Sequence, residues 1–267
     1  MNNDLLLFEK RGHIAQVTLN RPDKRNPLGL AGDGDQFQAM ARRVNDDFDI
    51  RCVIMTGAGP AFSAGGDLKA MRDREGEFGG SNLQLRDHYR SGIHGIIKAM
   101  WSIEVPIVGA INGPAIGLGG DVASLCDIRL SAASAKFGAT FLKIGLIPGD
   151  GGAWLLPRIV GWSRAAQLYF TGDVIDAETA CDWGLVSAVH PDDQLMAEAE
   201  KLARRIIQQP PQALRMTKRL MREGVNASFD AIMEMSAAMQ VLAQRTDDHI
   251  EAVTAFFDKR PPVFKGQ

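Results

Sequence analysis

GPAIGLGGDVASLCD, residues 113–127, joins an apolar run to a pattern typical of a helix, and this junction decides the fold class. The run before it, VPIVGAI (105–111), predicts a buried strand. Glycines at such a junction let a phosphate, a carbonyl oxygen or a second helix approach the backbone closely. Another strand candidate, DIRLSA (127–132), follows. A strand, a loop, a helix and a strand in this order predict parallel strands joined by helical crossovers, which is an α/β fold.

A second glycine loop occurs earlier in the chain, where AFSAGGD (61–67) follows the strand candidate CVIMTG (52–57). Ligands bind beyond the carboxyl ends of parallel strands, so the two loops are expected to converge on one site. Glycine-rich turns leave backbone N–H groups without internal partners, and one amide from each loop would hold a developing oxyanion. The alternative is that the glycines serve only tight turns and close packing. The residues alone leave both interpretations open.

The rest of the chain divides into a core and a helical end. We expect a core over residues 1–195 and a helical region over residues 196–267, because helical periodicity predominates after Pro157. The helical region is rich in methionine, which indicates packing against the core or a neighbouring subunit. Two further strands are expected at 5–8 and 14–20, and helices at 30–45, 82–101, 163–170, 195–208, 211–223 and 228–257.

Composition and charge exclude several classes of protein. The chain has 267 residues, of which 45% are hydrophobic and 23% are charged, as expected for a globular protein with a core. The net charge of −2 argues against nucleic-acid binding through bulk charge. Cys52, Cys126 and Cys181 form no CxxC pair, which predicts a reducing compartment without disulfides. No signal peptide, membrane span or metal-ligand spacing of histidines is evident, so a cytoplasmic protein without a metal site is expected.

Known glycine motifs fit the junction poorly. A dinucleotide site requires G-x-G-x-x-G, but Val122 stands where the third glycine would be, and Asp127 comes too soon for the ribose acid. No GK[ST] is present for a phosphate loop. The hydrolase elbow G-x-S-x-G also fails, because the first glycine before Ser63 is missing.

Three acids near the glycine loops are candidates for chemistry or for capping. Asp121 falls in the first turn of the predicted helix, where an acid either complements the helix dipole or acts as a general acid or base. Asp150, in IPGDGGAW, is either a turn residue or a second catalytic acid. Asp67 is expected to cap a helix that begins at Leu68.

Six stretches of the sequence, in this order along the chain, resemble the enoyl-CoA hydratase/isomerase (crotonase) family, and the resemblance covers essentially the whole chain. The blocks that carry the resemblance are TLNRPDKRN, AFSAGGDLK, VPIVGAINGPAIGLGGDVASLCDIRLSA, KIGLIPGDGGAWLLPRIVG, QALRMTKRL and FFDKRPPVFKG. The resemblance implies a spiral of ββα turns followed by helices that build trimers, commonly paired as hexamers. It also implies an acyl-CoA thioester as the substrate, with no cofactor other than this coenzyme A, and no nucleic-acid or membrane partner.

The resemblance also assigns roles to particular residues. It implies that the amides of Ala64 and Leu118 form the oxyanion hole for the thioester carbonyl. Asp121 then corresponds to the first of two acids that handle protons in family hydratases. The residues implied to contact coenzyme A are Lys24, Arg25, Asp67, Leu68 and Lys69, with Phe256 and Lys259 from a neighbouring subunit.

Two departures from the family pattern leave the reaction open. The second acid of the hydratases falls at Phe141, which cannot transfer a proton. Asp150 is the candidate substitute, although related enzymes that shift double bonds carry an aspartate one position earlier, at Gly149. We expect an enoyl-CoA hydratase, a lyase of fatty acid metabolism. The alternatives are an enoyl-CoA double-bond isomerase and a non-catalytic scaffold that binds coenzyme A.

Overall fold

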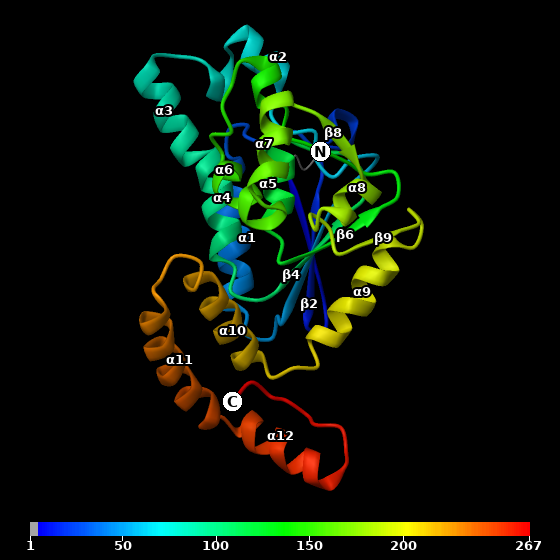
Figure 1. Ribbon diagram of the computed structural model, residues 1–267, viewed down its shortest axis with the longest axis vertical. Helices are drawn as coiled ribbons and strands as arrows, with labels where there is room; N and C mark the ends of the chain where they lie inside the picture. Colours follow the sequence, from blue (N-terminus) through cyan, green and yellow to red (C-terminus); the bar gives the residue numbers. More distant parts are fainter. Residues whose placement is uncertain (1–4) are drawn as a thin grey trace.

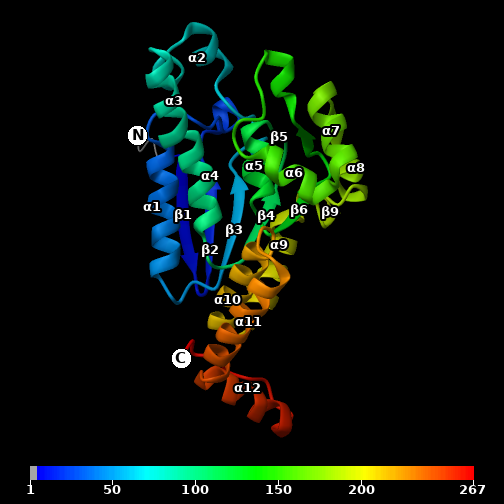
Figure 2. The ribbon, with the colours of Figure 1, turned by 60° about the vertical axis from the view of Figure 1, so that its left-hand side comes forward.

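A six-stranded sheet forms the centre of the protein, whose computed structural model describes residues 5–267 (Figures 1 and 2). The strands run in the order β1-β2-β3-β4-β6-β9, with β1 antiparallel to β2 and every other neighbouring pair parallel. The predicted parallel core is therefore confirmed. The bounds are β1 Leu6–Arg11, β2 Ile14–Leu19, β3 Cys52–Gly57, β4 Ile107–Ile111, β6 Ile128–Ala132 and β9 Ala188–His190.

The sequence pattern of each strand matches its burial. Ala15, Val17 and Leu19 alternate along β2 and are all fully buried, as the alternation predicts. Strands β3 and β4 are buried at every position, because helices cover both faces of this part of the sheet.

Helices α1 (Asp33–Asp46) and α4 (Ile93–Ser102) lie on one side of the sheet, and α9 (Leu195–Ile206) lies on the other (Figure 1). Helices α1 and α4 approach each other closely where two glycines meet. A Cβ atom added to Gly95 would lie 3.3 Å from the Cα of Gly34. The predicted single helix over 82–101 is wrong: the chain bends at Gly92, which separates α3 (Asn82–Ser91) from α4.

A second sheet was not expected from the sequence. It has three strands, β5 (Ala115–Ile116), β7 (Lys136–Gly138) and β8 (Val174–Asp176), each too short to show a periodicity. The elements around it are α5 Leu118–Ser124, η3 Thr140–Ile144, α6 Gly152–Val160, α7 Trp162–Thr171 and α8 Ala177–Asp182. The short elements nearer the amino end are η1 Pro22–Lys24, α2 Leu68–Asp73 and η2 Gly76–Phe78.

Three carboxyl-terminal helices project away from the core (Figures 1 and 2). They are α10 (Pro211–Glu223), α11 (Phe229–Gln244) and α12 (Asp247–Asp258). The predicted helix over 228–257 divides between α11 and α12, because the Thr246 hydroxyl caps α12 by accepting from the His249 amide at 3.1 Å. The expected division at residue 195 stays a prediction; α9, which begins there, packs against β3, β4 and β6.

Helix α10 attaches the projecting part to the core through buried cations. The Lys218 ammonium lies 2.6 Å from the Asp127 carboxylate and donates to the Val105 carbonyl, also at 2.6 Å. Arg215 pairs with Glu104 at 2.7 Å. These contacts join α10 to the entry of β4 and to the end of α5, so α10 is fixed to the same elements that carry the glycine junction.

Among residues 5–267, no helix is both long enough and apolar enough to cross a membrane.

Candidate functional site

The two glycine loops lie against each other, as the sequence predicts. The Ser63 amide donates to the Pro114 carbonyl, and the Ile116 amide donates to the Ser63 carbonyl, both at 3.0 Å. A Cβ at Gly119 would overlap the Ser63 carbonyl oxygen, so only glycine allows this approach. The glycines therefore permit close packing, and that packing brings the two loops to one place.

One of the two expected oxyanion amides is free to bind a ligand. Leu118 is the first residue of α5, and its N–H has no acceptor among the residues that the structure describes. The residue before it, Gly117, has φ 54° and ψ −124°, a backbone that a side chain would strain. Leu118 itself lines the main cavity of the site.

The prediction for Ala64 is wrong. Its N–H donates to the Arg25 carbonyl at 2.9 Å, and an amide has only one proton to donate. Two residues later, the N–H of Gly66 has no acceptor within residues 5–267, and Gly66 lines the same cavity as Leu118. The Leu118 nitrogen lies 3.6 Å from the β position of the intervening Gly65, so the two loops present neighbouring amides. Gly66 therefore replaces Ala64 as the candidate.

Asp121 and Asp150 form a buried pair of carboxyl groups. Asp121 is 5% exposed and Asp150 is 2% exposed, and the two carboxyl groups are close enough for each to affect the pKa of the other. One oxygen of each, Oδ2 of Asp121 and Oδ1 of Asp150, has no hydrogen-bond partner among the described residues. Asp121 lies directly against Gly152, where any side chain would overlap its carboxylate.

Burial makes this pair difficult to ionise. Desolvation raises the pKa of Asp121 well above its usual range, and the neighbouring Asp150 charge adds to this effect; the Gly152 amide opposes it. Desolvation also raises the pKa of Asp150, although the hydrogen bond from Asp121 opposes the increase. Both directions favour a pair that carries at least one proton, and Asp150 is the member that lines the cavity. The pair can thus supply one acid and one base at the same time.

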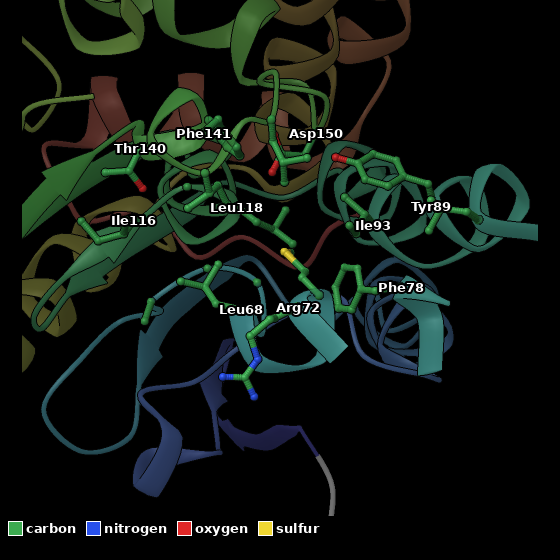
Figure 3. A pocket seen from close by; sticks show the side chains of 18 of the residues that line it. Leu68, Arg72, Phe78, Tyr89, Ile93, Ile116, Leu118, Thr140, Phe141 and Asp150 are labelled. Carbon is green, nitrogen blue, oxygen red and sulfur yellow. The ribbon is translucent and has the colours of Figure 1, made fainter. Parts of the chain in front are cut away.

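A largely apolar cavity of about 680 Å³ lies over these groups (Figure 3). Asp150 lines it directly, and Figure 3 shows its carboxyl group beside the hydroxyl of Tyr89. The apolar walls come from both glycine loops, from α2 and α3, and from η3. The main apolar lining side chains are Leu68, Met71, Phe78, Leu85, Ile93, Ile116, Leu118, Phe141, Ile144 and Leu146.

Phe141 occupies the place where the family resemblance puts a second acid. The side chain is 8% exposed, lies against Gly117, and has its ring 6.5 Å from that of Tyr169. This part of the cavity is therefore apolar, and Asp150 is the carboxyl group that accompanies Asp121.

The expected coenzyme A contacts fall into two groups. Lys24 and Arg25 are exposed on the turn that receives the Ala64 amide, which places them beside the first glycine loop. The remaining three residues of this group begin α2. Asp67 caps it by accepting from the Lys69 and Ala70 amides at 3.0 and 3.1 Å, as expected, and the exposed Leu68 lines the cavity.

Phe256 and Lys259 lie at the end of α12, far from this cavity in the same chain (Figure 1). Phe256 is 79% exposed. A contribution from these two residues would require a neighbouring copy, as the resemblance implies.

Sequence reasoning missed Tyr89 and His94. The His94 ring donates a hydrogen bond from Nε2 to the Gly149 carbonyl at 2.9 Å, and Tyr89 packs edge-on against it with ring centroids 5.2 Å apart. Both residues support the turn that carries Asp150. Their segment had no motif, and only the fold brings it to the turn.

The chain is similar to known proteins in both sequence and fold. Residues 9–267 match the family described as Enoyl-CoA hydratase/isomerase. The chain is 35% identical over 264 residues to the 1,2-epoxyphenylacetyl-CoA isomerase of Escherichia coli, covering 99% of each chain. It is 34% identical over 262 residues to the crotonyl-CoA hydratase of Syntrophomonas wolfei, covering 97% of each. The crystal structure of an enoyl-CoA hydratase from Bacillus anthracis superposes with a TM-score of 0.91 at 32% identity, over 98% of this chain and 100% of that one.

Proposed function

The chain belongs to the enoyl-CoA hydratase/isomerase family, and we propose that it is an acyl-CoA enzyme that adds water to a 2-enoyl-CoA, or removes water in the reverse direction. One observation carries the proposal: free loop amides and Asp150, one member of a buried carboxyl pair, border the same apolar cavity. Such a cavity suits an acyl chain, and its few polar groups are of the kinds that enolate chemistry requires.

The amides of Leu118 and Gly66 would bind the thioester oxygen. When a nucleophile adds to the β-carbon, the electrons of the double bond move toward this oxygen, which becomes negative. Two N–H donors stabilise that charge more than they stabilise the neutral carbonyl, so they lower the barrier. Because the donors are main-chain groups, the leucine at position 118 is compatible with this role.

The carboxyl pair would move the protons. Asp150, as the ionised member, accepts a proton from water while the water oxygen bonds to the β-carbon. Asp121, as the protonated member, then delivers its proton to the α-carbon of the enolate. The reaction leaves the proton on Asp150, and its return to Asp121 across their hydrogen bond restores the starting state.

Several further assignments belong to the proposal. Lys24, Arg25 and Lys69 would bind the phosphates of coenzyme A, because basic side chains are the usual partners of phosphate. Phe256 and Lys259 would complete that site from a neighbouring copy in a trimer or hexamer. Coenzyme A would enter only as part of the substrate, and the protein would work in the cytoplasm.

Double-bond isomerisation is the second candidate, and Phe141 favours it. An isomerase needs one group that removes a proton and returns it to another carbon, and a single proton-sharing pair suffices for this. A similar isomerase is among the relatives of the chain. A scaffold without activity has less support, because a buried carboxyl pair has a cost that binding alone does not require.

The test is a spectrophotometric assay with purified protein. Short, medium-chain and aromatic 2-enoyl-CoAs should lose their conjugated absorbance on hydration, whereas 3-enoyl-CoAs should gain it on isomerisation. Asp150→Asn should reduce either rate by at least about 100-fold, as expected for loss of a general base. The exposed Asp193→Asn is the matched control and should keep full activity. If no enoyl-CoA reacts while coenzyme A still binds, the scaffold is correct.

A further inference from the structure

Tyr89 is the side chain of α3 that reaches the reacting end of the cavity. None of the ten residues of this helix is fully buried, and most face solvent. Tyr89 is half-buried, lines the cavity, and points its hydroxyl toward Asp150 (Figure 3). The Tyr89 hydroxyl is therefore a polar group in a part of the cavity wall that is otherwise apolar.

The position of the Tyr89 ring is fixed by its neighbours. Its hydroxyl oxygen lies 3.0 Å from the β position of Gly149, so any larger residue there would displace it. The edge-on contact with His94 supports the ring from the other side, and His94 is itself bonded to the Gly149 carbonyl. The phenol is thus held against the turn that carries Asp150, and Gly149 leaves room for it.

Tyr89 retains its proton under the conditions in which the enzyme works. Burial raises its pKa above the ordinary value for tyrosine, and the negative charge of the carboxyl pair adds to the increase. The Tyr89 hydroxyl therefore stays neutral beside the carboxyl pair and can donate a hydrogen bond to an oxygen atom.

Other donors along the cavity wall are less suitably placed. Arg72 and Arg74 are exposed, and the Arg72 guanidinium pairs with Asp73 at 2.6 Å and points away from the carboxyl groups (Figure 3). Thr140 lies beside Ile116, on the side of the cavity opposite Tyr89 (Figure 3). Among the donor side chains labelled in Figure 3, Tyr89 is the one that points toward Asp150.

Building on the proposed function, we propose that the Tyr89 hydroxyl binds the oxygen atom that is added to, or lost from, the β-carbon of the acyl group. Hydration requires a second group, besides the base, that forms a hydrogen bond with this oxygen. Phe141, which stands where the family places a second acid, has no polar atom for this purpose. Tyr89 donates a hydrogen bond to the oxygen, while Asp150 accepts a proton from the same water. The phenol keeps its proton throughout, so the proton balance of the carboxyl pair is unchanged.

The experiment compares Tyr89→Phe with wild type in two reactions. Hydration places an oxygen on the β-carbon and isomerisation does not, so the variant should lose about 10- to 100-fold in kcat for hydration, as one charge-assisted hydrogen bond predicts. Its rate of isomerisation of a 3-enoyl-CoA should stay within about threefold of wild type. Tyr169→Phe is the matched control, because the Tyr169 hydroxyl also feels the charge of the pair but does not line this cavity.

A binding measurement gives a readout that is independent of turnover. The Asp150→Asn variant, in which Tyr89 is intact, should bind a 3-hydroxyacyl-CoA about tenfold more tightly than the matching saturated acyl-CoA. The double variant, which also carries Tyr89→Phe, should bind both ligands equally. The inference is overturned if Tyr89→Phe hydrates at the wild-type rate, if both reactions fall equally, or if wild type isomerises but never hydrates. The proposed function fails separately, if wild type transforms no enoyl-CoA at all.

Discussion

Gly152 determines where the Asp121 carboxylate can lie. A methyl group at position 152 would overlap that carboxylate, so Gly152→Ala must displace one of the two. Displacement of a catalytic group by about 1 Å costs roughly 100-fold in rate, and we expect kcat/KM for the best enoyl-CoA to fall by about this factor. Gly224→Ala is the control, because its nearest neighbours are 3.2 Å or more from the new atom. Equal activity in both variants would show that Asp121 is not catalytic.

The carboxyl pair also predicts the pH dependence of the rate. Burial raises the pKa of both acids, so the base form of Asp150 is lost at a higher pH than for an exposed carboxylate. The kcat for hydration should therefore decline as the pH falls, with the midpoint clearly above the ordinary carboxyl value of about 4. A kcat profile measured from pH 4 to 9 tests this. A profile that stays flat down to about pH 4 would contradict the assignment.

The same pair should reduce stability at neutral pH. In the unfolded chain Asp121 ionises near pH 3.9, whereas in the folded protein its pKa is raised, so above pH 3.9 ionisation favours the unfolded state. Asp121→Asn removes this cost, and its Tm at pH 7 should exceed that of wild type by about 2–4 °C or more. The difference should decrease as the pH is lowered toward 4. Scanning calorimetry across this range would detect the opposite trend if the reasoning is wrong.

Individual residues show where sequence reasoning works. Asp121 was predicted from its place in a helix that follows a buried strand, Asp150 from its glycine loop, and Leu118 from the family resemblance. Leu118 and Asp150 line the cavity, and Asp121 lies beside Asp150. Ala64 failed because the acceptor of its amide, the Arg25 carbonyl, lies 39 positions earlier in the chain, and no local pattern reveals such a bond. Tyr89 was missed for the same reason: only the fold brings α3 to the turn at Asp150.

At the scale of elements, α10 depends on a buried lysine. Burial lowers the pKa of Lys218 to about 8, although the contact with Asp127 opposes the shift. The pKa of a lysine in the unfolded chain is about 10.4. Between about pH 8 and this value the unfolded chain binds more protons than the folded protein, so the contribution of Lys218 to the free energy of unfolding increases as the pH rises.

Lys218→Met should lower the free energy of unfolding by roughly 1–3 kcal/mol, because the Val105 carbonyl loses its buried donor. The deficit should be larger near pH 10 than at pH 7, as measured by urea unfolding at each pH. Lys201→Met on the exposed part of α9 serves as the control. A deficit that decreases with pH would contradict the assigned shift.

The elements that sequence reasoning predicted well are the long or strongly patterned ones, such as β3, β4, α1 and α10. Two of the predicted helices are each divided into two helices in the structure. A backbone bend at Gly92 interrupts the first, and a hydroxyl cap at Thr246 interrupts the second, although the hydrophobic periodicity continues through both positions. The second sheet escaped prediction because strands of two or three residues cannot display an alternation.

At the scale of the whole molecule, the projecting helices expose apolar side chains that a second copy would cover. Exposed fractions reach 77% for Phe229, 63% for Leu242 and 76% for Phe257. Large exposed apolar side chains on projecting helices are compatible with an interface. The homotrimer or hexamer implied by the family resemblance stays a prediction, and it explains why Phe256 and Lys259 lie far from the cavity of their own chain.

Leu242→Glu should dissociate the expected oligomer, because it places a charge within the apolar surface of α11. Light scattering coupled to size-exclusion chromatography should show a shift toward the monomer mass, with loss of activity at low acyl-CoA concentration. Gln244→Glu introduces the same charge at an exposed polar site of α11 and should change neither property. A wild-type protein that elutes as a monomer would refute the interface.

The bend at Gly92 has an evolutionary consequence. It places α3, which contributes Tyr89 and Leu85 to the cavity, outside the packed layer to which α4 belongs. Mutations in α3 can therefore accumulate without disturbing the sheet or the helices on it. We expect changes at α3 positions such as Leu85 to alter the acyl groups that this chain accepts, while Tyr89, the loops and the acids stay under separate selection.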